Sequence, residues 1–204
     1  MNALGELLAL AGRQFAALGQ PWALVGGLAV SVRCEPRFTR DVDIAVAVSS
    51  DAQAEALVNA FVAGGFRVQS VVEQTARHRL ATVRLTGPRA LEIEIMLDLL
   101  FASSGLEPDI CAAAEAIEVF PGVHAPVASL GHLIALKLLA RDDEARPQDA
   151  GDLRQLSARA AAGDWRVAAA AVELICARGF QRGKDLEAEL QAQQKRAAAE
   201  HGRG

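Results

Sequence analysis

The stretch GGLAVSVRCEPRFTRDVDIAV, from Gly26 to Val46, decides the fold class of this chain. It opens with two adjacent glycines after a short apolar segment. It closes with Asp41 and Asp43 inside a segment whose alternating pattern predicts a β-strand. Side chains of a strand point alternately to opposite faces, so the two aspartates share one face with Cα atoms about 6.5 Å apart. The predicted order is strand, glycine turn, helix, and a strand that carries paired carboxylates.

Two interpretations of the paired carboxylates are open from the pattern alone. Like charges this close repel each other unless water covers them or a cation lies between them. Mg²⁺ prefers oxygen ligands and often binds through one or two carboxylates together with substrate phosphates. The alternative is a plain solvated face of a sheet, because Asp41 and Asp43 alternate with apolar residues.

A third carboxylate is predicted on a second alternating segment, LEIEIMLDLL, at residues 91–100. Asp98 lies on its polar face and is the first candidate to complete a two-metal site, and Glu94 on the same face is the second. Gly26 and Gly27 supply the phosphate-binding part of the hypothesis. Glycine lacks a Cβ atom, so the backbone can approach a phosphate closely, and the following helix N-terminus offers free N–H groups.

The chain as a whole predicts an α/β part followed by a helical part. Apolar periodicity predicts strands at 22–25, 41–48, 66–72, 79–85 and 91–100, and helices at 3–18, 28–33 and 52–63. Helices are also predicted at about 129–143, 147–160, 165–178 and 184–199. We therefore expect an α/β domain at 1–128, built on a mixed, twisted sheet with flanking helices, and a C-terminal helical region at 129–204 packed on it.

Composition restricts the class of protein. Of 204 residues, 51% are hydrophobic, enough for a sizeable core, and the net charge of −4 does not favour a dedicated nucleic-acid binder. The cysteines Cys34, Cys111 and Cys176 are far apart and odd in number, which favours reduced thiols in a cytoplasmic protein. We expect no signal peptide and no membrane partner, because the longest apolar run, residues 21–32, is too short to span a bilayer.

The combination of motifs resembles the signature of the polymerase-β-like nucleotidyltransferase superfamily, in particular its AbiEii/AbiGii toxin branch. That signature reads Gly-Gly-x-Ala, followed by Arg-x-Thr-x-Asp-hydrophobic-Asp. The matching residues are Gly26, Gly27, Ala29, Arg37, Thr39, Asp41 and Asp43. The segment IMLDLLF resembles the strand of the third aspartate, which assigns that role to Asp98. The segment LIALKLLARDDEARPQDAGDLRQL resembles a later motif, with matches at Lys137, Arg146, Asp149 and Asp152.

The resemblance implies a sheet of the nucleotidyltransferase type and a Mg²⁺-dependent enzyme, with Mn²⁺ as an alternative metal. Such an enzyme binds a nucleoside triphosphate such as ATP, transfers its nucleotidyl group to an acceptor hydroxyl and releases pyrophosphate. The implied catalytic and metal-binding residues are Asp41, Asp43 and Asp98. The implied nucleotide-binding residues are Gly26, Gly27, Arg37, Thr39 and Lys137, supported by Arg146, Asp149 and Asp152. The implied acceptor is a tRNA 3′ end or a protein, and the implied partner is a cognate antitoxin in a toxin–antitoxin or phage-defence system.

Two other functions stay open. One is a small-molecule nucleotidyltransferase resembling the aminoglycoside enzymes, with Glu92, Glu94 and Asp109 as contributors to an acidic cleft. The other is a non-catalytic nucleotide-binding or antitoxin-like module, against which the presence of all three aspartates argues. An acceptor-binding rim is a further hypothesis, with solvated surface as its alternative for any single residue; its members would be Arg33, Arg37, Arg40, Arg77, His78, Arg79 and Arg84.

Lys137 has two competing interpretations. It lies in the most apolar predicted helix of a chain with only three lysines, and a buried ammonium needs a partner or an aqueous cleft. The resemblance implies that it faces the same cleft as Asp41 and Asp43 and contacts the triphosphate. The alternative is a structural lysine that either extends its ammonium group to the surface or pairs with Asp149 or Asp152.

Overall fold

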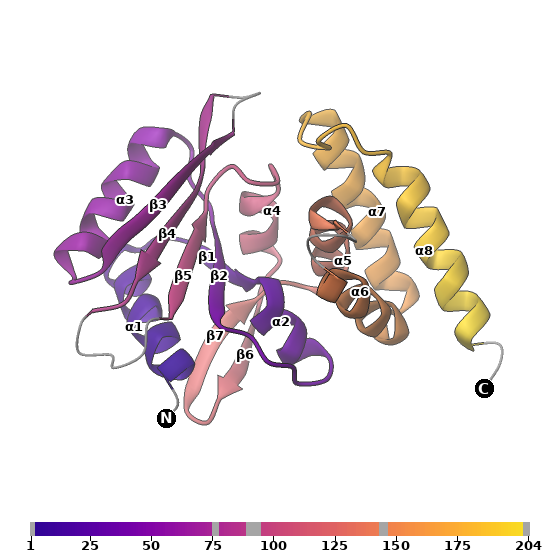
Figure 1. The fold of residues 1–204 in the computed structure, drawn as a ribbon, viewed down its shortest axis with the longest axis horizontal. Helices are drawn as coiled ribbons and strands as arrows, with labels where there is room; N and C mark the ends of the chain where they lie inside the picture. The colour runs from indigo at the N-terminus through magenta and orange to yellow at the C-terminus, as the bar shows by residue number, and fades with distance from the viewer. Residues whose placement is uncertain (1–2, 75–77, 89–94, 143–146, 202–204) are drawn as a thin grey trace. The chain divides into compact units, whose positions relative to one another are not determined.

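The computed structural model describes residues 3–74, 78–88, 95–142 and 147–201, and the chain divides into two compact units (Figure 1). We call the first the sheet unit. It comprises Met1–Ala29, Arg37–Ser103 and Glu107–Ala128. We call the second the helical unit. It comprises Val30–Pro36, Ser104–Leu106 and Ser129–Gly204.

The sheet unit is built on a seven-stranded sheet. Its strands are β1 (Trp22–Val25), β2 (Asp41–Val46), β3 (Arg67–Gln74), β4 (Arg79–Thr86), β5 (Met96–Leu100), β6 (Glu115–Phe120) and β7 (Val123–Val127). Their order across the sheet is β3-β4-β5-β2-β1-β7-β6. Strand β2 pairs in parallel with β5 and antiparallel with β1, so the sheet is mixed. The predicted α/β class is therefore confirmed.

Helices cover both sides of this sheet. Helices α1 (Ala3–Leu18) and α3 (Asp51–Ala63) lie on one side, and the short α4 (Glu107–Ala112) lies on the other (Figure 1). Phe15 of α1 stacks on Trp22 with ring centroids 5.1 Å apart and meets Phe61 of α3 edge-on at 5.0 Å. Such aromatic pairs contribute about 0.5–1.5 kcal/mol beyond the area that they bury. This cluster holds α1 and α3 together against the strands.

The helical unit contains α5 (Leu130–Ala140), α6 (Pro147–Arg159), α7 (Ala162–Ala177) and α8 (Leu186–His201). Helix α5 is apolar nearly all round and buried along most of its length, as expected for a central helix. Gly131 lets α7 approach α5 closely, since a Cβ atom there would lie 2.5 Å from the carbonyl oxygen of Asp164. Lys184 donates to the carbonyl oxygens of Leu138 and Arg141 and so provides hydrogen-bond partners for backbone carbonyl groups at the C-terminal end of α5.

Three elements were not predicted. Helix α4 and strands β6 and β7 occupy residues 107–127, where no structure was assigned from the sequence. The turn of the β6–β7 hairpin contains Pro121 and Gly122, and Gly122 has a φ of 76°, which is typical of glycine. Helix α2 (Gly26–Arg33) begins at the first glycine rather than at residue 28. Strand β5 begins at Met96, and the predicted strand residues 91–94 lie outside the described residues.

No helix within the described residues is long and apolar enough to cross a membrane.

Candidate active site

The three predicted carboxylates lie on neighbouring strands of the sheet unit. Asp43 of β2 is the direct neighbour of Asp98 of β5, and Asp41 lies two residues before Asp43. Direct neighbours on adjacent strands project from the same face of a sheet, and so do residues two apart on one strand. Asp98 is buried, with 7% of its surface exposed, whereas Asp41 and Asp43 are half-buried. The sheet therefore brings all three carboxylates to one face.

This face is not a plain solvated surface. Ala45 follows Asp43 on the same side of β2 and is buried. Helix α4 packs against this part of β2, and the thiol of Cys111 donates to the carbonyl oxygen of Ala45 at 3.4 Å. Burial raises the pKa of Cys111 to about 12. Helix α4 thus covers this face of β2 at Ala45, whereas Asp41 and Asp43 beside it are half-buried.

Gly26 and Gly27 leave room for the side chains of Asp43 and Arg37. Gly26 directly follows β1 and has a φ of 66°, a conformation that residues with a side chain rarely adopt. A Cβ atom there would lie 2.5 Å from Cγ and 2.7 Å from Cβ of Asp43. A Cβ atom on Gly27 would lie 2.5 Å from Nη2 of Arg37. The glycine pair therefore lets Asp43 and Arg37 pack against the start of α2.

The segment between α2 and β2 carries two more of the predicted nucleotide-binding residues, Arg37 and Thr39. Arg37 donates through Nη1 to the carbonyl oxygen of Phe38 at 3.1 Å, and the Thr39 hydroxyl donates to that of Asp41 at 3.4 Å. Phe38 is 79% exposed, and the Arg40 guanidinium lies 5.4 Å from the centre of its ring. Arg37 and Thr39 thus hydrogen-bond to backbone carbonyl groups just before β2 and at its first residue.

Arg84 of β4, a predicted member of the acceptor-binding rim, contacts one of the three carboxylates. It is the direct neighbour of Asp98 across the β4–β5 pair. Its Nε donates to Oδ1 of Asp98 at 2.8 Å and its Nη2 donates to Oδ2 at 2.6 Å, a two-pronged ion pair. The hydrogen bonds to Asp98 raise the pKa of Arg84, and the nearby charges of Asp41 and Asp43 add to the effect. The sequence signal was a cation in the middle of an otherwise mostly apolar strand.

Arg79, another arginine of the expected rim, is also held in an ion pair. Its Nε donates to Oδ1 of Asp51 at 2.6 Å, and Oδ2 of Asp51 accepts from the backbone N–H of Leu80 at 3.2 Å. The hydrogen bond from Arg79 lowers the pKa of Asp51. This pair joins β4 to the start of α3. Arg77 lies outside the described residues.

Lys137 forms two ion pairs inside the helical unit. Its Nζ lies 2.6 Å from Oδ1 of Asp149 and 2.7 Å from Oδ2 of Asp152, both on α6. The side chain of Lys137 is 12% exposed, and those of Asp149 and Asp152 are 3% and 1% exposed. The pairing that we had weighed as the structural alternative is therefore present. The predicted supporting residue Arg146 lies outside the described residues.

The donor set of the sheet unit fits a hard divalent cation. Asp41, Asp43 and Asp98 supply carboxylate oxygens from one face, the ligand type that Mg²⁺ prefers. Within the described ranges, no three His, Cys, Asp or Glu side chains converge closely enough to enclose an ion as they stand. Arg84 engages both oxygens of Asp98. The second-choice carboxylate, Glu94, lies outside the described residues, as does Glu92.

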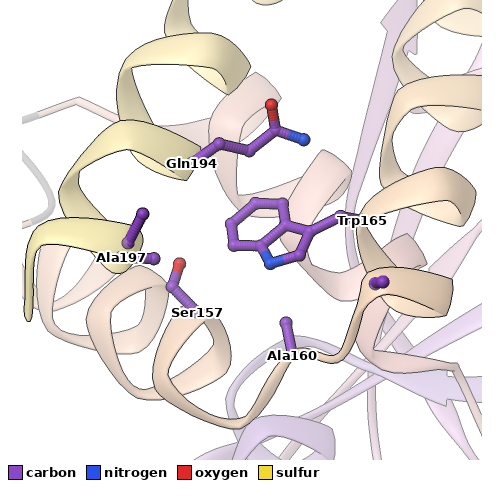
Figure 2. Close-up of a pocket in the computed structure, with 7 residues that line it drawn as sticks. Ser157, Ala160, Trp165, Gln194 and Ala197 are labelled. Atoms are coloured by element: carbon purple, nitrogen blue, oxygen red, sulfur yellow. The ribbon is translucent and has the colours of Figure 1, made fainter. Parts of the chain in front are cut away.

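A separate open pocket of about 430 Å³ lies in the helical unit (Figure 2). The Trp165 indole faces Ser157 of α6 and Gln194 and Ala197 of α8 across it (Figure 2). None of the predicted site residues lines this pocket, and its lining contains no charged side chain. It offers neither metal ligands nor cations for a triphosphate.

Comparison with solved structures defines the class of protein. An antigenic nucleotidyltransferase-like protein from Paracoccidioides brasiliensis is 18% identical, with a TM-score of 0.55 over 93% of this chain and 92% of that chain. The resistance factor ANT(2″)-Ia, solved with adenylyl-2″-tobramycin, is 13% identical, with a TM-score of 0.52 over 98% and 99%. The lincosamide adenylyltransferase LnuA, solved with lincomycin, is 14% identical, with a TM-score of 0.50 over 76% and 97%. The chain therefore has a nucleotidyltransferase fold.

The family follows from the sequence model that matches the chain. Residues 8–203 match the family described as "Nucleotidyl transferase AbiEii toxin, Type IV TA system". The chain belongs to this AbiEii family of nucleotidyltransferases, as the motifs between Gly26 and Asp152 had indicated. No curated protein sequence matches the chain.

Proposed function

We propose that this chain is a Mg²⁺-dependent toxin that transfers a nucleotidyl group from a nucleoside triphosphate to a hydroxyl of a tRNA 3′ end or of a protein. The observation that carries the proposal is the alignment of Asp43 with Asp98 on neighbouring strands, with Asp41 on the same face. Bound Mg²⁺, or Mn²⁺ in its place, would neutralise phosphate charge and ease deprotonation of the acceptor. Asp41, Asp43 and Asp98 would hold the metal ions in this mechanism.

The remaining residues of the sheet unit have complementary roles in the proposal. Asp98 would accept the proton of the acceptor hydroxyl, because a carboxylate freed from its partner is a competent general base. In the proposal, backbone N–H groups at the N-terminus of α2, at Gly26 and Gly27, bind a phosphate. Arg37 and Thr39 would add side-chain donors to the same triphosphate.

Lys137 is the proposed triphosphate contact of the helical unit. An ammonium group has three donor hydrogens, and the two aspartates of α6 account for two of them. We assign the third to a phosphate oxygen. In this proposal Asp149 and Asp152 orient the ammonium group, and Arg146 supports the same segment.

The family description also motivates the biological part of the proposal. It places the family in type IV toxin–antitoxin systems, so we propose a cognate antitoxin as the partner of this chain. We further propose that the protein acts in the cytoplasm, where nucleoside triphosphates and tRNA are available.

The test is a transfer assay with labelled nucleoside triphosphates and Mg²⁺. The acceptors are total tRNA, a bacterial protein extract and an aminoglycoside, each assayed separately. We expect label on tRNA or protein with the wild-type chain and none with Asp43→Asn. The control is Asp51→Asn, which removes an aspartate of the same unit that pairs with Arg79 instead. Label on the aminoglycoside alone would replace the proposed acceptor, and transfer by Asp43→Asn at the wild-type rate would overturn the mechanism.

A further inference from the structure

Arg84, Asp98 and Asp43 form one row across three strands of the sheet unit. Arg84 of β4 is the direct neighbour of Asp98 of β5, which in turn is the direct neighbour of Asp43 of β2. Side chains in one row project from the same face and meet their immediate neighbours. A cation is therefore built into the sheet beside the carboxylates, at a position set by strand pairing rather than by a loop.

Arg84 uses both oxygens of Asp98. The two contacts, at 2.8 Å and 2.6 Å, have the fork geometry that makes arginine–carboxylate pairs specific as well as strong. The Asp98 side chain is only 11% exposed, so water has little access to it, whereas the Arg84 side chain is 42% exposed. The carboxylate is fixed in the sheet, and the guanidinium is the partner with room to move.

Arg84 also offsets the charge of the site. Three carboxylates on one face carry a charge of −3 when ionised, and Arg84 contributes +1 within reach of all three. Like any arginine, it stays protonated at physiological pH. Without bound metal, Arg84 thus compensates part of the carboxylate charge, as a divalent cation would in the metal-bound protein.

We propose that Arg84 is an internal competitor of the metal: its guanidinium holds Asp98 in the free protein and releases it only when metal and nucleotide bind. The inference rests on the proposed metal site of Asp41, Asp43 and Asp98. Arg84 is a positioning residue in this scheme, since it acts through Asp98. Its effect is to disfavour metal binding by the free protein and to make the third carboxylate available when the triphosphate arrives with its own negative charge.

The test measures Mn²⁺ affinity of the full chain without nucleotide, by the loss of the free Mn²⁺ signal in electron paramagnetic resonance. We expect Arg84→Gln to bind Mn²⁺ at least about tenfold more tightly than wild type, equivalent to about 1.4 kcal/mol. Arg79→Gln is the matched control, because Arg79 lies on the same strand and pairs with Asp51. It should bind Mn²⁺ as wild type does. Unchanged or weaker binding by Arg84→Gln would overturn the proposal.

A second variant separates competition from simple charge removal. Arg84→Lys keeps the positive charge but cannot form the two-pronged pair with Asp98. We expect it to bind Mn²⁺ more tightly than wild type and less tightly than Arg84→Gln. If Arg84→Lys binds Mn²⁺ with wild-type affinity while Arg84→Gln binds it more tightly, the loss of positive charge alone explains the result. That outcome would overturn the proposal. Arg84→Lys also serves the test if Arg84→Gln does not fold.

Asp43→Asn in the same titration separates this inference from the proposed function. If Asp43→Asn binds Mn²⁺ as tightly as wild type, the ion does not bind at these carboxylates, and both proposals fail. If Asp43→Asn weakens binding while both Arg84 variants match wild type, the metal site stands and the role of Arg84 is refuted.

Discussion

Replacing Gly26 with alanine tests whether the glycine turn exists to make room for Asp43. Two costs are expected. The first is backbone strain of about 1–2 kcal/mol, because φ is 66° at this position. The second is overpacking of about 1–3 kcal/mol, because the new methyl group would lie 2.7 Å from Cβ of Asp43, an atom that no rotamer change can move away.

Gly19→Ala is the matched control for the strain alone. Gly19 has a φ of 60°, and a Cβ atom there would have no other atom within 4 Å. For a chain of this size, each kcal/mol shifts the melting temperature by about 2–4 °C. We therefore expect Gly26→Ala to melt about 2–12 °C below Gly19→Ala in the same calorimetric or circular-dichroism scan.

The two variants should differ even more in transfer activity. A displacement of a catalytic group by about 1 Å can cost about 100-fold in rate. Gly26→Ala should lose about that much, because Asp43 must move, whereas Gly19→Ala should keep the wild-type rate below its melting temperature. Equal melting temperatures for the two variants, together with equal rates, would refute the idea that Gly26 positions Asp43.

Two further predictions concern ion pairs. Lys137→Met should destabilise the protein by about 3–5 kcal/mol in urea unfolding, because two buried carboxylates lose their shared cation. Adding Asp149→Asn and Asp152→Asn should recover part of that loss, and no recovery would show that their charges are not the cause. Arg79→Gln should lower the free energy of unfolding at pH 7 by less than about 1 kcal/mol, as is typical of a partly exposed pair, and this is measured as a small drop in melting temperature. Since pairing lowers the pKa of Asp51, its stabilisation is complete above the ordinary value of 3.8 and disappears as the pH falls below it. The difference between the two proteins should therefore shrink as the pH falls below 3.8, and a difference that stays constant there would contradict the assignment.

The carboxylate strand could be predicted from the sequence because its signals are local. Alternation places Asp41 and Asp43 on one face without any knowledge of the rest of the fold. The glycine pair before α2 is equally local, and the structure adds a role that the sequence did not predict. Gly26 accommodates Asp43, whereas phosphate binding by the same turn is part of the proposed function.

The register of the sheet could not be predicted from periodicity. Asp43 and Asp98 are 55 residues apart, and nothing in either segment specifies that they become direct neighbours. The polar face of residues 91–100 and the resemblance to a known family both made Asp98 a candidate for the third carboxylate, but neither specified the register. The contact of Arg84 with Asp98 was missed for the same reason, because it depends on the register of β4 against β5. A one-residue shift would place Arg84 on the opposite face.

The β6–β7 hairpin was missed for a different reason. Strand β6 is an edge strand, and none of its residues is fully buried. Its sequence, EAIEVF, therefore lacks the apolar run of a core strand. The turn residues Pro121 and Gly122 were the available signal, because such a pair between two short β-branched segments is typical of a hairpin.

Nucleotidyl transfer itself is tested most directly by following which phosphorus atom of the triphosphate reaches the acceptor. The wild-type chain is incubated with Mg²⁺, acceptor and ATP or another nucleoside triphosphate, labelled either at the α-phosphorus or at the γ-phosphorus. We expect α-label on the acceptor and γ-label only in released pyrophosphate. With Asp43→Asn we expect neither labelled acceptor nor labelled pyrophosphate. Transfer of γ-label to the acceptor would contradict the account, because it would show phosphoryl transfer in place of nucleotidyl transfer.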